Sequence, residues 1–414
     1  MIKYLNDILK KEKDKIYFTL LILITLLPAT LLMPSLILNA WTIIISIIFI
    51  SQLYLKKEYK IFDNIFFYFL IFFWISLIIN LFFTSDLNNS ILRALGFSKF
   101  IIFVYALKYV LTFKKFRYEK LIYKIWSIIF CLVTLDLLFQ YIFGFNTLGF
   151  KSPWNLRLGG FLNEELKIGH YYYAFALLAI SYFISSSKNN NVIYLLIILF
   201  LTTSLLIGER SNFIKMLLMI IFFILLLNYK NFLKKIIIFI FGFLIFVMSV
   251  SLNEMLKYRY YDTLAQPIFD KGITEYMNET QYGAHYKTAI KIFKNYPFFG
   301  VGINNFRNES PKDIYKDNTP ANNSRSATHP HQLHLEFLSE TGIFGYIIFL
   351  IFIICSLVLS IKNYLTNKNK YQLASILFVI VSILPLIPSG SFFTSYGATI
   401  FWINYAIMIS YQKK

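Results

Sequence analysis

Long apolar runs recur along almost the whole chain, and short polar connections separate them. Each run approaches the roughly 20 residues that an α-helix needs to cross a bilayer. The pattern therefore predicts an all-α polytopic membrane protein with about 12 transmembrane helices. The runs cover residues 16–33, 36–55, 61–83, 92–113, 121–144, 169–186, 191–207, 213–228, 234–252, 343–361, 371–388 and 394–411.

The composition agrees with a membrane protein. Of the 414 residues, 57% are hydrophobic, 19% aromatic and only 15% charged. Soluble domains carry about 25% charged residues, so a single soluble core is excluded. Both cysteines, Cys131 and Cys355, lie inside apolar runs and form no disulfide framework or CxxC metal motif. The net charge of +19 is accompanied by no nucleic-acid-binding motif, so we expect no nucleic acid partner.

Lysine and arginine divide unevenly between the two sides of the predicted bundle. The two termini and the connections near residues 56–60, 114–120, 188, 230–235 and 362–370 carry most of the basic residues. The opposite short connections, at 34–35, 84–91, 208–212 and 389–393, contain one, Arg210. By the positive-inside rule, both termini are cytoplasmic.

Two longer connections, residues 145–168 and 253–342, fall on the outer side. The second is too long for a turn and predicts a small folded lobe, where function is expected. The chain would then divide into three parts. Residues 1–252 contain nine spans and the 145–168 loop, residues 253–342 form the long outer loop, and residues 343–414 contain three spans.

Arg210 opposes the charge trend, because it lies in an outer connection. A guanidinium group has a planar fork that matches phosphate oxygens, so Arg210 is a candidate clamp for an anionic headgroup. The alternatives are an ion pair with the adjacent Glu209 and a surface arginine without function.

Three histidines, His329, His331 and His334, lie close together at the end of the long loop. Pro330 favours an extended His329 and suits the first turn of a helix, so we expect a helix from about His331. His331 and His334 would share one face of this helix. The helix dipole would lower the pKa of His331 and keep its imidazole neutral, as a general base requires.

Two other interpretations of this cluster stay open. A metal site could use the three histidines and Glu336, but the spacing does not match HExxH, so we expect no metal. The residues could also cap an interfacial helix without any chemical role. Further outer candidates are Arg157, Glu165, Arg259 and the glycine-containing segment 300–306. This segment has too few glycines for a nucleotide-binding loop, so no cofactor is expected. Within the spans, Asp136 could serve an ion site or a helix–helix hydrogen bond.

The order of these motifs resembles the O-antigen ligase family, which includes O-antigen polymerases and protein O-oligosaccharyltransferases. The resemblance covers about residues 150–345 and rests on four segments of this chain. They are Arg157 to Glu165, Gly208-Glu209-Arg210-Ser211, Pro297-Phe298-Phe299-Gly300-Val301-Gly302, and His331-Gln332-Leu333-His334-Leu335 through Glu340-Thr341-Gly342. Gln332 stands where asparagine is commoner in the family.

The resemblance implies an inverting, metal-independent glycosyltransferase of the C-class type in the bacterial inner membrane. Its donor would be a glycan on undecaprenyl diphosphate at the periplasmic face. His331 would be the base and Arg210 the catalytic clamp, with substrate contacts from Arg259, Arg157, His329, His334 and Glu165.

The identity of the acceptor distinguishes two possible functions. We expect an O-antigen ligase of lipopolysaccharide biosynthesis, which uses lipid A-core; the alternative is an O-antigen polymerase, which extends a second lipid-linked glycan. A glycolipid transporter is disfavoured, because transporters bind substrate near the midplane, whereas these polar residues cluster at the outer surface.

Overall fold

Apolar helices make up most of the structure, a computed structural model that describes residues 14–113, 116–152, 157–163, 165–187, 189–227, 243–244, 246–385 and 387–412. Within these ranges the β pairing is one isolated bridge, between Phe145 and Lys151. In chain order the helices are α2 (Lys15–Thr25), α3 (Leu27–Thr30), α4 (Ser35–Lys56), η1 (Tyr59–Phe62), α5 (Ile65–Asn80), η2 (Leu81–Phe83), α6 (Leu87–Gly96), α7 (Ser98–Thr112), α8 (Glu119–Phe143), η3 (Gly160–Leu162), α9 (Ile168–Ser186), α10 (Asn190–Leu206), α11 (Arg210–Leu226), α13 (Glu254–Lys257), η4 (Tyr258–Ala265), α14 (Gln266–Glu279), α15 (Gln281–Asn295), α16 (Phe306–Glu309), η5 (Asp313–Tyr315), η6 (Asn322–Ser324), α17 (Leu333–Asn367), α18 (Lys370–Ser382) and α19 (Ser395–Ser410).

The fold is that of an all-α polytopic membrane protein, as predicted. Among the described residues, 6 helical segments are long and apolar enough to cross a membrane: α4, α5 with η2, α6 with α7, α8, α9 and α17. Shorter apolar helices include α2, α10 and α18. Every predicted apolar run contains helical residues; in the run 234–252 the described residues, 243–244 and 246–252, are helical, and the others lie outside the described ranges. The predicted number of about 12 spans stays a prediction.

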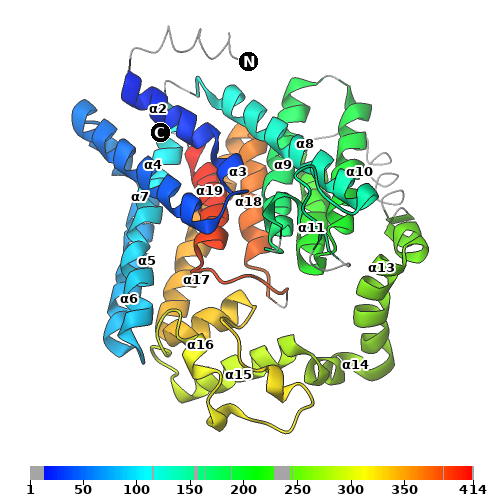
Figure 1. Cartoon of the computed structure of the whole chain (residues 1–414). Helices are drawn as coiled ribbons and strands as arrows, with labels where there is room; N and C mark the ends of the chain where they lie inside the picture. The colour runs from blue at the N-terminus through cyan, green and yellow to red at the C-terminus, as the bar shows by residue number, and fades with distance from the viewer. Residues whose placement is uncertain are drawn as a thin grey trace.

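Helix α19 lies in the middle of the bundle, between α7, α17 and α18 (Figure 1). It has no polar face, and a helix that is hydrophobic all round is buried. Its Trp402 is fully buried, with ring centroids 5.3 Å from Phe97 and 5.1 Å from Phe401. The contact with Phe97 joins the N-terminal and C-terminal helices in one core.

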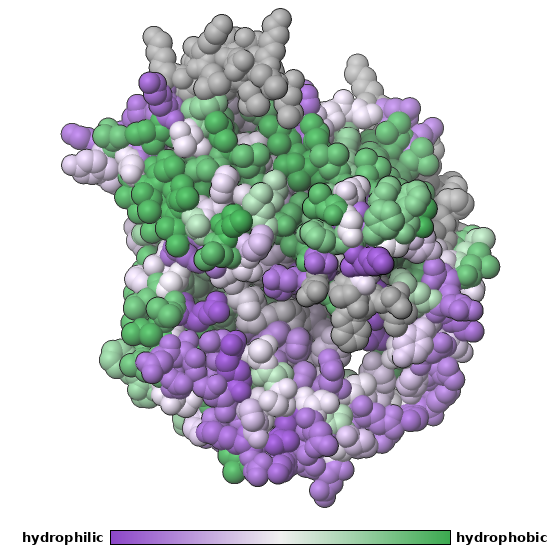
Figure 2. Space-filling model, in the orientation of Figure 1, coloured by the Kyte–Doolittle hydropathy of each residue, from purple (hydrophilic) through white to green (hydrophobic). Residues whose placement is uncertain are grey.

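The segment between the bundle's central and C-terminal helices forms a lobe, which we define as residues 253–332. Helices α13 to α16 arch across one end of the bundle, opposite α2 and the end of α19 (Figure 1). The face shown in Figure 2 is hydrophobic over the bundle and hydrophilic over the lobe. The lobe has a small core of its own, with Ala289, Ile292, Val301, Phe306 and Tyr315.

Two glycines attach the lobe to α17. Helix α17 is kinked at Gly342, whose φ of 63° and ψ of −169° suit only glycine. A Cβ on Gly342 would lie 2.3 Å from the Phe298 oxygen, and one on Gly300 would lie 2.5 Å from the Glu340 carbonyl carbon. The backbone N–H of Val301 donates to the Ser339 oxygen at 3.0 Å. The segment 297–302 and the kink therefore pack backbone against backbone, which explains why both motifs contain glycine.

The carboxylate of Glu340 strengthens this attachment. It accepts hydrogen bonds from the backbone N–H groups of Asn304 at 2.8 Å and Phe306 at 3.2 Å. Glycine-containing segment 300–306 is thus a turn that docks on α17. Asp136 has a similar structural role, since it accepts hydrogen bonds from the backbone N–H and the hydroxyl of Thr147 at 2.9 and 2.6 Å.

Candidate active site

Arg210 and Arg259 lie side by side at the lobe end of the bundle. Arg210 begins α11, and its Nη1 donates to the carbonyl oxygens of Arg259 at 3.2 Å and Thr263 at 3.3 Å. In return, Arg259 Nε donates to the Gly208 oxygen at 2.7 Å. These hydrogen bonds connect the start of α11 to η4. Each guanidinium group has further N–H donors that could bind a ligand.

A third guanidinium and one acid complete this arginine cluster, which we define as Arg157, Glu209, Arg210 and Arg259. Burial, and then the charges of Arg157 and Arg210, lower the pKa of Arg259 to about 10. Glu209 is buried; its carboxylate accepts a hydrogen bond from the Gly169 N–H at 3.1 Å and does not form an ion pair with Arg210 within the described ranges. Burial raises the pKa of Glu209, and Arg157 and Arg259 oppose that shift. Three cations around one carboxylate leave a net positive site, which favours an anion.

Glu165 does not contact this cluster. It forms a 2.8 Å ion pair with Lys167, and its side chain is half exposed. Its predicted role in substrate binding therefore has no support from the observed contacts. The buried acid near the arginines is Glu209, which the sequence interpretation treated only as a neighbour of Arg210.

His331 lies outside the helix that we predicted for it. Helix α17 begins at Leu333, and Gln332 is its N-cap, with a side chain that accepts a 2.8 Å hydrogen bond from the Leu335 N–H. His331 has a φ of 57°, in the left-handed region, which turns the chain before the helix starts. The predicted helix start near His331 and the shared face with His334 are therefore wrong.

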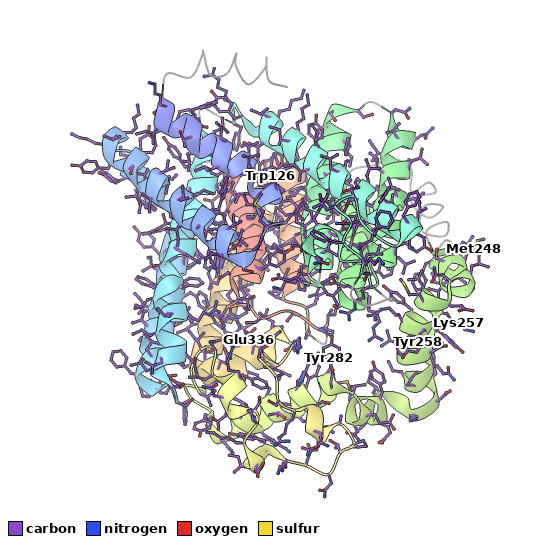
Figure 3. The ribbon with its side chains drawn as sticks, viewed as in Figure 1. Trp126, Met248, Lys257, Tyr258, Tyr282 and Glu336 are labelled. Carbon is purple, nitrogen blue, oxygen red and sulfur yellow. The ribbon has the colours of Figure 1, made fainter. Side chains whose placement is uncertain are left out.

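His331 instead belongs to a histidine cluster, which we define as His285, His329 and His331. The ring centroid of His331 lies 4.0 Å from that of His329 and 5.2 Å from that of His285, which comes from α15. Tyr282, also on α15, has its ring 5.7 Å away and faces the space between lobe and bundle (Figure 3).

The histidine cluster is neutral at pH 7. Burial, and then the nearby His285, lower the pKa of His331 to about 4. Burial, followed by the charges of its histidine neighbours, lowers the pKa of His329 to about 3. We predicted a neutral His331, but the cause is burial among other imidazoles and not a helix dipole. The ranges that the structure describes contain no group of three or more His, Cys, Asp or Glu that could hold a metal ion.

His334 has a different environment. Its Nε2–H donates to the Ile383 oxygen at 2.7 Å, and its Nδ1 accepts from the Tyr346 hydroxyl at 3.0 Å. Both ring nitrogens are occupied inside the protein. This histidine therefore orients α17 against the end of α18.

One segment, residues 388–392, links His331 to α11, the helix that begins with Arg210. The Ser389 N–H donates to the His331 oxygen at 2.8 Å, and Lys215 Nζ on α11 donates to the Pro388 oxygen at 3.1 Å. On the opposite side, the carboxylate of Glu336 accepts from the Ser391 hydroxyl and from the Phe392 N–H, the latter at 2.9 Å. The position of His331 thus depends on the connection between α18 and α19, where the sequence pattern predicted no functional residue.

Several residues of the site were missed for different reasons. Lys215 is an ionisable residue inside an apolar run, and that signal alone marks a candidate functional residue. His170, whose Nδ1 lies 4.0 Å from a carboxylate oxygen of Glu209, stands near the start of another apolar run. His285 carried no signal, because it lies far from the other histidines in the chain and in an ordinary amphipathic helix.

A comparison with protein families finds one similarity that covers this site. Residues 191–350 match the family model described as O-Antigen ligase. This part of the chain is similar to O-antigen ligases. The match includes Arg210, Arg259 and the three residues of the histidine cluster. No curated protein matches the chain. The O-antigen ligase domain and the apolar helices support a membrane-bound ligase- or polymerase-type function in glycan biosynthesis.

Proposed function

We propose that the protein is an O-antigen ligase. It transfers a glycan from undecaprenyl diphosphate to lipid A-core at the periplasmic face of the bacterial inner membrane. One observation carries this proposal: the 388–392 segment contacts both α11, the helix that begins with Arg210 of the three-arginine cluster, and the backbone of His331 in a neutral histidine cluster. An enzyme with a diphosphate leaving group and a hydroxyl nucleophile needs this combination of cation and base.

In the proposed mechanism, an acceptor hydroxyl attacks the anomeric carbon of the donor sugar. The bond between that carbon and the diphosphate oxygen breaks, the diphosphate leaves with the electron pair, and the anomeric configuration inverts. His331 takes the hydroxyl proton, and general base catalysis of this kind contributes about 10²- to 10⁴-fold. Arg210 and Arg259 stabilise the charge that grows on the diphosphate, with Arg157 as a third cation. No step requires a metal.

His329 and His334 have separate roles in this proposal. His329 lies beside His331, with ring centroids 4.0 Å apart, and contacts the donor from the segment before Pro330. His334 supports the site indirectly, through its hydrogen bonds to Ile383 and Tyr346.

Reconstitution tests the proposed reaction. The purified protein is placed in liposomes with lipid-linked glycan and lipid A-core, without any ion gradient. We expect glycan on the core, and no product from Arg210→Ala or His331→Ala proteins of equal folded amount. Longer lipid-linked chains in place of core-linked product would identify a polymerase. Movement of the intact glycolipid across the bilayer without transfer would identify a transporter.

A further inference from the structure

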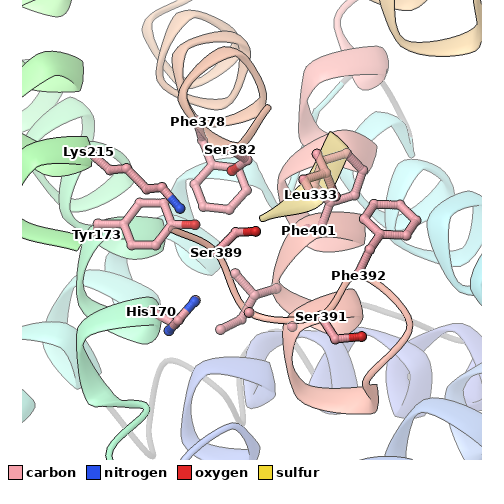
Figure 4. Close-up of a pocket in the computed structure, with 13 residues that line it drawn as sticks. His170, Tyr173, Lys215, Leu333, Phe378, Ser382, Ser389, Ser391, Phe392 and Phe401 are labelled. Carbon is pink, nitrogen blue, oxygen red and sulfur yellow. The ribbon is translucent and has the colours of Figure 1, made fainter. Parts of the chain in front are cut away.

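A pocket lies inside the bundle, next to the 388–392 segment. Its walls come from α9, α11, α17, α18 and α19, and the close-up in Figure 4 shows two chemically different sides. One side presents His170, Tyr173, Lys215 and Ser389. The other is mainly apolar, with Leu333, Phe392 and Phe401 and the hydroxyl of Ser391. Phe378 stacks on the Tyr173 ring at a centroid distance of 5.1 Å, and Ile400 also lines the pocket.

Lys215 is the unusual member of the polar side. Its side chain is only 2% exposed. Within the described residues the ammonium group makes one hydrogen bond, to the Pro388 oxygen, and lies 5.7 Å from the centroid of the Tyr173 ring. Among the described residues, no carboxylate lies within ion-pair distance of it. An ammonium has three N–H donors, so donors remain for a ligand. A buried charge without a counterion is costly, and a bound anion would remove that cost.

A second observation also indicates a ligand. The hydroxyl oxygen of Ser389 is buried and has no hydrogen-bond partner within the part of the chain that the structure describes. The backbone N–H of the same residue is already used by His331. A free hydroxyl and a cation without a carboxylate partner thus line the same pocket, and phosphate oxygens accept hydrogen bonds from both kinds of donor.

The pocket shares a wall with the arginine cluster. His170 lines the pocket, and its Nδ1 lies 4.0 Å from a carboxylate oxygen of Glu209. Along α11, Lys215 is five residues beyond Arg210, which corresponds to about 7.5 Å of helix rise. An anion at Lys215 would therefore lie deeper in the bundle than one held by the arginines.

We infer that this pocket binds the lipid end of the donor, namely the phosphate attached to the polyprenol together with the first isoprene units. Lys215 and Ser389 bind the phosphate oxygens, and the apolar side contacts the hydrocarbon. The inference rests on the proposed function, because it assigns part of the donor to these residues. It places the isoprenoid-linked phosphate at Lys215 and leaves the sugar-linked phosphate to Arg210 and Arg259.

The test measures binding without any transfer reaction. The full-length protein in detergent is titrated with geranylgeranyl diphosphate, and geranylgeraniol, inorganic diphosphate and phosphatidylglycerol serve as comparison probes. Lys215→Met should weaken binding of the prenyl diphosphate at least about tenfold, the loss expected for a charge-assisted hydrogen bond. Binding of the prenol should not change. Lys108→Met is the matched control, since Lys108 is also a buried lysine in an apolar helix but does not line the pocket.

A second variant covers the case in which Lys215→Met fails to fold. Ser389→Ala retains the hydrogen bond from Lys215 to the Pro388 oxygen and the hydrogen bond from the residue 389 N–H to the His331 oxygen, so this variant should fold. Its affinity for prenyl diphosphate should nevertheless be lower than that of the wild type. Wild-type affinity in Ser389→Ala and in any folded Lys215→Met protein would overturn the inference. Equal competition by inorganic diphosphate or phosphatidylglycerol would also overturn it, because the pocket would then not recognise a prenyl phosphate.

A failure of the pocket inference can be distinguished from a failure of the proposed ligase function. Lys215-dependent binding of prenyl diphosphate by a protein that transfers no glycan would reject the ligase assignment and retain the pocket. Glycan transfer with an unchanged donor KM in Lys215→Met would reject the pocket and retain the ligase assignment.

Discussion

Replacing His331 tests the proposed base, and the backbone at this position decides which substitution is informative. His331 has a φ of 57°, where alanine is strained by about 1–2 kcal/mol, whereas asparagine adopts this region readily. His331→Asn therefore removes the imidazole and keeps the turn before α17, together with the backbone hydrogen bond to Ser389. His331→Ala should lose the same activity and also some thermal stability.

The expected loss of turnover is large. General base catalysis contributes about 10²- to 10⁴-fold, which corresponds to about 3–5 kcal/mol of activation free energy. Donor binding should change little, because the arginine cluster holds the diphosphate in the proposed mechanism. His334→Ala is the control: its two hydrogen bonds support the fold, so it should lower stability more than turnover per folded molecule.

The pH dependence gives an independent check. The folded pKa of His331 is about 4, lowered from 6.5 by burial and by His285, so the wild-type rate should persist through mildly acidic pH and fall as the pH approaches 4. Because the unfolded pKa is higher, protonation favours the unfolded state, and stability should decrease as the pH falls from about 6.5 towards 4. Initial rates of glycan transfer must therefore be normalised to the folded fraction at each pH.

One result would refute the assignment of the base. If His331→Asn and His331→Ala keep both the wild-type turnover and the acid limb, His331 does not accept the proton. His329, with its pKa of about 3, and Glu336 would then be tested in its place.

Four further predictions follow from the same structure and sequence. Arg210→Lys should lose much of the transfer activity at an unchanged protein level, because an ammonium does not reproduce the guanidinium fork; normal turnover in Arg210→Ala would make it a surface arginine. Glycan transfer should survive EDTA, and a loss restored by one particular metal would favour a metal site. Gly342→Ala should destabilise the protein by at least about 3 kcal/mol in thermal unfolding, because its Cβ would lie 2.3 Å from the Phe298 oxygen. Gly96→Ala, which has nothing within 4 Å, should not destabilise it. Reporter fusions at residues 188 and 366 should read cytoplasmic and fusions near residue 320 periplasmic; a cytoplasmic signal at 320 would contradict the proposed location of the site.

Local sequence patterns were sufficient for the helices and for the class of the protein. A run of apolar side chains has the same preference for lipid or a buried core wherever it occurs, so α4, α8 and α17 could be predicted without knowing their neighbours. The motifs around Arg210 and His331 also indicated the family, because each is a short segment with its own residue pattern. Even here the end of a helix was uncertain: the N-cap at Gln332 depends on one side-chain hydrogen bond, and the prediction placed the start two residues too early.

The tertiary structure alone decided which of these segments meet. His285 on α15 reaches His331, Lys215 on α11 supports the 388–392 segment, and Glu209 rather than Glu165 lies among the arginines. The interactions of His285 with His331, of Lys215 with Pro388, and of Glu209 with Arg157 and Arg259 have no local signature, because each joins residues that are far apart in the chain. They depend on how helices pack, and packing also sets the burial that lowers the pKa of His331. The sequence by itself determined the apolar helices and the chemical groups available, and the long-range packing of those helices determined the environment in which each group would act.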